Sequence, residues 1–222
     1  MMIKTGNLRV RKRDGSIFAT TQGQISEEPD FVIYCPFSAE SGMSNLLQNG
    51  FELNWTTDGT VNSNCYEGGL LCCDNIILDL TKLWSVKFEY MYTGSVTLTE
   101  PRSSTTLSSF WNHIFAWGTH IADENPGKSV EWPRQALGIE TGTDKKQPCE
   151  LWCNVTDIKS WHYYSIEYKD NVTSVSIDNV PQETKQLEYN NKVEGFYLSG
   201  GGNYHSLPCK IKNLIIFATL TS

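Results

Sequence analysis

The sequence lacks a long run of apolar residues, and this excludes a membrane-spanning helix of ordinary length. No stretch approaches the roughly 20 apolar residues that cross a bilayer as a helix. The basic beginning of the chain is followed by no apolar segment, so we expect no secretory signal. Alanine is scarce, whereas Trp, Tyr and Phe make up 12% of the residues, a balance that favours strands over helices.

Positive charge is also in short supply, because the formal net charge is −7. An acidic chain is repelled by phosphate backbones, so we predict no nucleic-acid partner for the main body. The length suits one large all-β domain with a tail.

Paired Cys-x-x-Cys motifs are absent, and this argues against a zinc site. The seven cysteines are Cys35, Cys65, Cys72, Cys73, Cys149, Cys153 and Cys209. Cys149-x-x-x-Cys153 has no evident partner pair, so neither metal nor another cofactor is predicted. We expect reduced thiols, with Cys72 and Cys73 on opposite sides of a strand and with Cys35 and Cys209 as small core residues.

The clearest pattern present is a hairpin between Trp161 and Asn179. Alternate residues from His162 to Tyr168 are suited to one buried face of a strand. Residues 169–171 can supply a tight turn, because Asp and Asn tolerate left-handed backbone angles. A second strand then returns through Val175 and Ile177.

This hairpin resembles one found in concanavalin A-like lectin and laminin-G-like domains, although Asp178-Asn179 stands where the family usually has Asp-Gly. Further segments resemble other strands of that family in the same order: 31–38, 85–92, 114–118, 136–140, 193–200 and 210–217. The resemblance implies an antiparallel two-sheet β-sandwich, a concanavalin A-like jelly roll, over residues 28–222.

The strand pattern also predicts a core and a further hairpin. Residues 68–80 are expected to form two strands about an Asp74-Asn75 turn. Because Ile211 and Leu214 differ in strand parity, we expect some of the predicted core to face away from the interior. The predicted core residues are Phe88, Tyr90, Trp117, Ile166, Val175, Ile177, Phe196, Ile211, Leu214 and Ile216.

Residues 1–27 are predicted to form a separate basic arm. Segments 7–11 and 17–20 alternate like a small hairpin but hold too few apolar residues for a core of their own. The cluster Arg9, Arg11, Lys12 and Arg13 precedes an acidic linker, so it is a candidate anchor to a negative partner surface. A solvated, unattached terminus is an equally weighted alternative.

Catalytic motifs are not apparent, and we predict that the protein is not an enzyme. Glycoside hydrolysis generally needs two carboxylates flanking the bond. Glu167 and Asp170 are three apart and would face opposite sides of a strand, and Glu140 has no carboxylate at the second or fourth position after it. No nucleophile-elbow motif accompanies the four scattered histidines.

A sugar site is the sharper possibility for binding, since sugar rings stack on exposed aromatic faces beside polar groups. The candidates occupy predicted loops, with Trp132 the strongest because polar residues flank it. The predicted ligand-binding residues are Trp132, Trp111, His113, Tyr204 and His205.

Two functions are open at this point. The favoured one is a structural protein of a bacteriophage virion surface, anchored through residues 1–27 to other virion proteins or to copies of itself and displaying a lectin-like domain, with cell-surface glycans as further partners. Such a protein would be made in the bacterial cytoplasm and reside in the virion. The alternative is a soluble carbohydrate-binding module or an inactive glycosidase-like lectin. The fold alone suits both.

Overall fold

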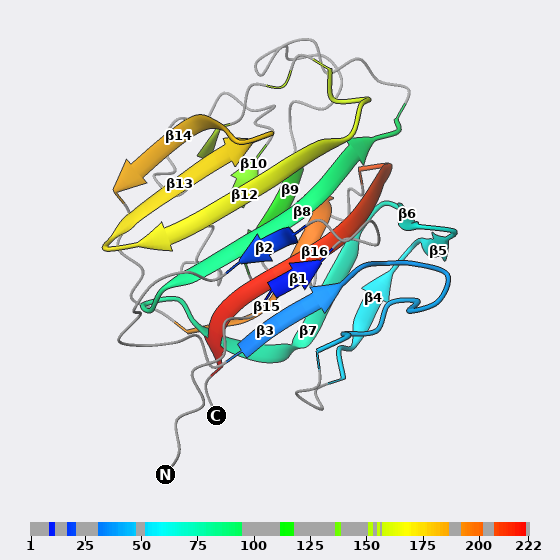
Figure 1. Ribbon diagram of the computed structural model, residues 1–222, viewed down its shortest axis with the longest axis horizontal. Coiled ribbons are helices and arrows are strands. Elements are labelled where there is room, and N and C mark those ends of the chain that lie inside the picture. Colours follow the sequence, from blue (N-terminus) through cyan, green and yellow to red (C-terminus); the bar gives the residue numbers. More distant parts are fainter. Residues whose placement is uncertain are drawn as a thin grey trace, which may run out of the picture.

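A computed structural model of the protein describes residues 9–11, 17–20, 31–47, 52–94, 112–117, 136–138, 151–152, 155, 157–186, 192–201 and 207–220 (Figure 1). All regular elements in these ranges are strands. None of the described residues forms a helix long and apolar enough to cross a membrane. The fold is therefore all-β, as the sequence predicts.

One half of the main sheet is built around β8 (Trp84–Tyr92). Along one edge, β8 pairs with β12 (His162–Lys169), which is followed outward by β13 (Val172–Ile177) and β14 (Val180–Gln186). Along the other edge lies β16 (Cys209–Leu220), which also pairs with β3 (Phe31–Cys35) and β6 (Cys65–Gly68). β6 in turn pairs with β5 (Thr60–Asn62).

The other half is built around β15 (Lys192–Gly201), which lies between β7 (Leu71–Asp79) and β9 (Asn112–Trp117). β4 (Trp55–Thr57) pairs with β7. β10 (Ala136–Gly138) pairs antiparallel with β9 and parallel with β11 (Leu151–Trp152).

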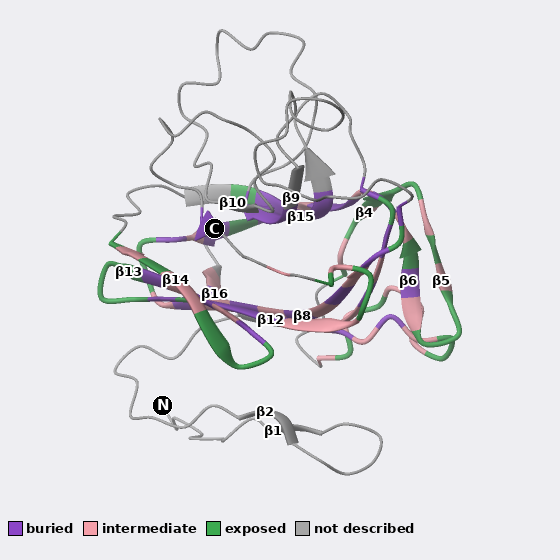
Figure 2. Cartoon of the chain, turned by 90° about the horizontal axis from the view of Figure 1, so that it is seen from above, coloured by how far each residue is buried: buried purple, intermediate pink, exposed green. Residues whose placement is uncertain are grey.

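The end of β16 joins the two halves, because Thr219 and Leu220 pair with Asp79 and Leu78 of β7. The result is a 14-stranded, almost wholly antiparallel sheet that curves into a half-barrel. In Figure 2, β9, β10 and β15 lie opposite β8, β12 and β16. Aromatic rings meet between these layers, with ring centroids 5.1 Å apart for Trp84 and Trp117.

All ten residues of the predicted core are buried, so that prediction is confirmed. The expectation that some would face outward is wrong, and β16 shows why. Its register against β8 shifts between Lys212 and Ile215, and Asn213 takes a positive φ of 55°. This bulge reverses the strand parity and lets Ile211 and Leu214 both face the core.

The predicted hairpin is also confirmed. Lys169 pairs with Val172 across a two-residue turn in which Asp170 and Asn171 have φ values of 53° and 61°. Asp178 and Asn179 form a second such turn, with φ values of 52° and 66°. Two consecutive left-handed residues match the twist of antiparallel strands. Asn179 therefore takes the conformation for which the resembling family uses glycine.

The predicted turn at Asp74-Asn75 is wrong, because β7 runs unbroken through both residues. The pairing of β7 with β15 instead shifts register near this point, where Gly195 of β15 has a φ of 67°. The turn-forming pair thus lies at a bulge. As expected, Cys72 and Cys73 point to opposite sides: Cys73 joins the main core, and Cys72 packs with Ala116 and Tyr197.

β1 (Arg9–Arg11) and β2 (Ile17–Thr20) form a two-stranded antiparallel sheet separate from the main one. The side chains of Arg9 and Arg11, and all of Lys12 and Arg13, lie outside the described residues. The division of the chain at residue 27 stays a prediction. Cys35 and Cys209 are fully buried, which confirms their predicted place in the core. All described cysteines are free thiols.

Candidate functional site

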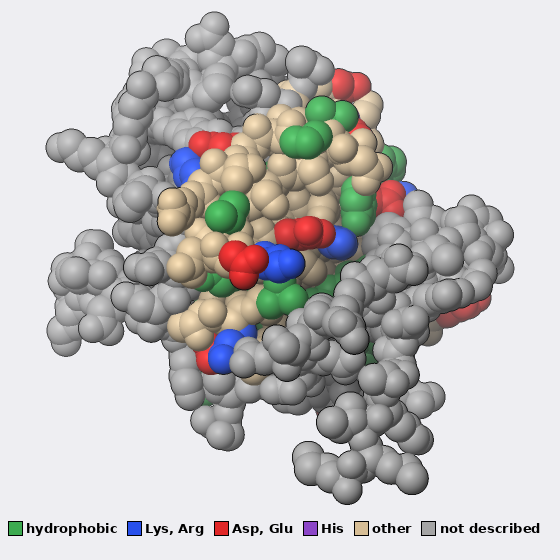
Figure 3. Space-filling view, turned by 60° about the vertical axis from the view of Figure 1, so that its left-hand side comes forward, with side chains coloured by type: hydrophobic (Ala, Val, Ile, Leu, Met, Phe, Trp, Pro, Cys, Tyr) green, Lys and Arg blue, Asp and Glu red, His purple; other side chains and the backbone are tan. Residues whose placement is uncertain are grey.

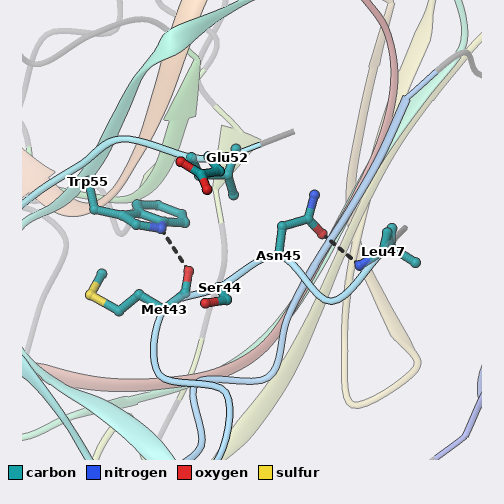
Figure 4. Close-up of a pocket in the computed structure, with 7 residues that line it drawn as sticks. Met43, Ser44, Asn45, Leu47, Glu52 and Trp55 are labelled. Carbon is teal, nitrogen blue, oxygen red and sulfur yellow. Dashed lines mark hydrogen bonds between the residues drawn. The ribbon is translucent and has the colours of Figure 1, made fainter. Parts of the chain in front are cut away.

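A pocket of about 470 Å³ lies between the segment that follows β3 and the segment that leads into β4 (Figure 4). Its volume falls within the range of small-molecule sites, which is roughly 300–1,000 Å³. The lining residues are Met43, Ser44, Asn45, Leu47, Glu52, Leu53 and Trp55.

Asn45 fixes the first wall to β3. Its side-chain oxygen accepts hydrogen bonds from the backbone N–H of Tyr34 at 3.1 Å and of Leu47 at 3.2 Å. The N–H of Leu46 donates to the Tyr34 carbonyl at 2.9 Å. These bonds replace a regular strand partner for the segment, since backbone groups need partners wherever the chain packs. The wall is therefore irregular in conformation but well bonded.

Asn75 fixes the second wall to β7. Its side-chain Nδ2 donates to the Glu52 carbonyl at 2.8 Å, and its Oδ1 accepts from the Asn54 N–H at 2.9 Å. One amide thus satisfies a backbone acceptor and a backbone donor on either side of Leu53. The bulge in β7, which the sequence suggested as a turn, presents the residue that holds the pocket wall.

Trp55 connects the two walls. Its indole Nε1 donates to the Met43 carbonyl at 2.9 Å. Its ring meets Phe37 and Phe196 edge-on, with centroid distances of 5.9 and 5.8 Å. The ring is half-buried, so one part packs on the core while another lines the pocket. A Trp with this many fixed contacts is a rigid surface for a ligand.

The polar groups that remain for a ligand are few. Glu52 is exposed, and no described residue pairs with its carboxylate. It is the single charged residue among those described that line the pocket. The Ser44 hydroxyl adds a group that can donate or accept. The Glu52 carboxylate and the Ser44 hydroxyl thus line the same pocket as the Trp55 ring, and both can accept hydrogen bonds.

Elsewhere the sheet surface carries charges in opposite pairs, as Figure 3 shows for one face. Lys87 and Glu167 lie 2.9 Å apart, and Lys212 and Glu89 lie 3.0 Å apart. Lys212 also lies over the Trp161 ring, 4.2 Å from its centroid. Paired surface charges give little net field, so this face offers no strong attraction to a charged partner.

His162 is the one histidine whose side chain is described, and its contacts argue against a role as a catalytic base. Its Nδ1 lies 2.7 Å from the Asp178 carboxylate, and its Nε2 lies 2.6 Å from the Asp157 carbonyl. Two acceptors on one ring are both satisfied only by the imidazolium. Burial lowers the pKa of His162, but these two bonds and the nearby aspartates raise it more, so the net shift is upward.

The described structure does not test the predicted sugar-binding residues, so their role stays a prediction. Trp111, Trp132, Tyr204 and His205 lie outside the described residues. His113 lies on β9 opposite Gly138 and Gly200, and its side chain is outside the described part. No group of three or more His, Cys, Asp or Glu among the described residues could hold a metal ion.

Sequence reasoning missed Trp55, Glu52 and Asn75. A usable signal was present, because Trp55 stands in the polar setting Asn54-Trp55-Thr56 with Glu52 three residues before it. Trp132 drew attention for the same kind of setting. The role of Asn75 could not be predicted from local sequence, because the backbone groups that its side chain bonds are 21 and 23 residues away in the chain.

Comparison with known proteins shows similarity of fold only. No family model and no curated protein matches the chain. Among solved structures, Trypanosoma rangeli sialidase matches 86% of this chain and 30% of its own, with a TM-score of 0.52 and 9% identity. The same enzyme in complex with 2,3-difluoro-KDN matches 94% of this chain and 32% of its own, with a TM-score of 0.56 and 8% identity.

The carbohydrate recognition domain of Emp47p aligns over 89% of this chain and all of its own, with a TM-score of 0.44 and 8% identity. The protein spans about a third of the length of the sialidase structures that it resembles. The comparisons therefore show that this chain shares an all-β fold with part of the sialidase structures.

Proposed function

We propose that this protein is a carbohydrate-binding module, built as a two-sheet sandwich of the concanavalin A-like type, and that the pocket at Trp55 is its sugar site. The observation that carries the proposal is the fixed Trp55 ring next to the Glu52 carboxylate, which no described residue pairs. Sugar C–H surfaces stack on aromatic rings, and sugar hydroxyls donate to carboxylates. The sialidase-like fold supports the same class.

We propose binding without hydrolysis. The pocket contains one carboxylate among its described lining residues, whereas most glycosidases place two carboxyl groups about the scissile bond.

The test is a titration of the full chain with a panel of neutral methyl pyranosides, followed by NMR of the indole N–H signals. The chain has seven Trp residues, and Trp55→Phe assigns the signal of Trp55. We expect that signal to shift with a Kd near the millimolar range, as for many single small-ligand sites. Absence of any shift across the panel would overturn the proposal.

Variants locate the site. Glu52→Ala should abolish binding with no change in melting temperature, because the Glu52 side chain has no described partner. Glu167→Gln is the matched control, since Glu167 is an exposed carboxylate on β12, outside the pocket. Sugar-induced shifts of other indole signals that persist in Trp55→Phe would place the sugar elsewhere.

A second candidate function rests on β1 and β2, which pair with each other and not with the main sheet. We propose that residues 1–27 anchor the module to a larger assembly, with a bacteriophage virion as the predicted setting. Other virion proteins or further copies of this chain would be the partners, and the sugar site would then serve adhesion.

A further inference from the structure

The pocket's charge and its engaged hydrogen-bond donors give it a preference among sugars, and this inference rests on the proposed function. We infer that the pocket selects neutral or positively charged pyranosides and rejects anionic ones such as uronic and sialic acids. The first ground is the lining: Glu52 brings a negative charge, and none of the seven described lining residues is Lys, Arg or His.

The second ground is that three N–H donors around the pocket are already engaged. The Trp55 indole donates to the Met43 carbonyl, the Leu47 N–H to Asn45, and the Asn54 N–H to Asn75. A bound carboxylate needs several such donors, commonly including Arg or Lys. Among the lining side chains, the Ser44 hydroxyl is one donor that such a ligand could use.

The remaining polar group favours a donor ligand. The Glu52 carboxylate accepts hydrogen bonds at both oxygens and donates none at neutral pH. Sugar hydroxyls, or the ammonium of an amino sugar, complement it. A ligand carboxylate beside Glu52 would meet like-charge repulsion. This chain therefore resembles the sialidase in fold, but we do not expect it to bind an anionic sugar.

Matched ligands test this preference on the full chain. Methyl glucoside, galactoside and mannoside are each compared with the 6-carboxylate of the same ring and, for glucose and galactose, with the 2-amino sugar. We expect each uronate to bind at least about tenfold more weakly than its neutral partner, given the size of close like-charge interactions. Amino sugars should bind as well as or better than neutral sugars.

Glu52→Gln identifies the source of the preference. Glutamine has nearly the same shape and retains a hydrogen-bonding group, so it removes the charge with little other change. In Glu52→Gln the neutral-to-uronate ratio should fall towards one, while Glu167→Gln should leave it unchanged. In the wild type the ratio should also shrink at high salt, because the Debye length falls to about 3 Å at 1 M.

The possible results separate this inference from the proposed function. Equal binding of neutral and anionic sugars, with loss in Glu52→Ala, overturns the preference and leaves the sugar site standing. A preference that persists in Glu52→Gln also overturns it, because the charge is then not its source. Failure of every neutral and amino sugar to bind overturns both proposals.

Discussion

The meander of β12, β13 and β14 and the pocket region of residues 34–75 are held together by different kinds of contact. In the meander, two-residue turns at 170–171 and 178–179 join neighbouring strands, whose pairing is regular except for one register shift between Ser174 and Ser176. In the pocket region, side-chain amides of Asn45 and Asn75 bond backbone groups up to 23 residues away. The meander is thus specified by adjacent sequence, and the pocket by distant sequence.

This difference bears on where function is found. The two-residue turns need residues that tolerate left-handed backbone angles, whereas a wall bonded through one amide depends on the side chain of that residue. Loops placed by such specific contacts on a rigid sheet are common sites of binding. The pocket region therefore has the kind of construction that a binding site needs, and the meander supplies the scaffold behind it.

The largest expected effect tests whether the two regions share one core. Phe196 contacts Trp55 behind the pocket, and Phe88 stacks on Tyr164 of the meander, with ring centroids 5.8 and 5.4 Å apart. Both rings are fully buried. Phe196→Ala and Phe88→Ala should each lower the free energy of unfolding by about 3–5 kcal/mol, measured by chemical denaturation. Two separate unfolding transitions would show independent cores instead.

The second prediction contrasts two asparagines, one in each region. Asn75→Ala removes two hydrogen bonds from the pocket wall and should cost about 1–2 kcal/mol. It should also abolish the sugar-induced shift of the Trp55 indole signal. Asn179→Gly should change stability by only a few tenths of a kcal/mol, because glycine adopts the same left-handed conformation.

The opposite order of these two effects on stability would contradict the comparison between the meander and the pocket region. If Asn179→Gly destabilises the protein more than Asn75→Ala, the meander turns depend on a side chain and the pocket wall does not. Asn75→Asp refines the test, because it retains the acceptor for the Asn54 N–H and loses the donor to the Glu52 carbonyl. We expect it to fall between the wild type and Asn75→Ala in sugar binding.

The same contrast explains what could be predicted from the sequence. The hairpin at 161–179 was predictable because period-two burial and left-handed Asp and Asn residues are local signals. The bulge at Asn213 was not, because an inserted residue changes parity without any turn signal. Asp74-Asn75 carried a turn signal, but β7 pairs with β15 on both sides of these residues, at Cys73 and at Ile77, and the strand continues through them.

Site residues were less predictable than the fold for a related reason. Trp55 shares its type and polar flanks with Trp132, and nothing in the local sequence marks Trp55 as the Trp that bridges two pocket walls. The distinction comes from Met43 and Asn75, which the fold brings to Trp55 and its wall. Local composition can suggest which aromatic residues are candidates for a binding site, but tertiary contacts are needed to show that one of them lines a pocket.

A smaller effect is expected from pH, and it concerns the meander. The folded pKa of His162 is raised above its ordinary value of 6.5. Its stabilising contribution is therefore fully present below about that pH and is lost as pH rises through the folded pKa. Burial raises the pKa of Asp178, but hydrogen bonds from the Tyr163 N–H and from His162 lower it more, so the folded pKa lies below 3.8. The stabilising contribution of Asp178 is therefore lost only as pH falls through that folded pKa.

Thermal melts of the wild type and His162→Gln check this sign. The wild type should be the more stable protein near pH 5.5, and the difference should shrink towards pH 8.5, over the range in which His loses its proton. The effect should stay below about 1 kcal/mol because Asp178 is half exposed and solvent screens the pair. A difference that grows with pH would show that His162 is held neutral.

The smallest effect on stability is expected from removal of residues 1–27, which compares the whole main sheet with β1 and β2. Those two strands pair with each other in a sheet of their own, and a two-stranded unit is marginal alone in water. Chain 28–222 should therefore melt like the full chain.

If residues 1–27 anchor the module, the full chain should form a larger species by sedimentation, with copies of itself or with added partner, and the truncated chain should not. The larger species should weaken with salt, because basic side chains would pair with carboxylates on the partner. A large drop in melting temperature on truncation would instead make residues 1–27 part of the folded body, and unchanged assembly would remove their anchoring role while leaving the sugar site as proposed.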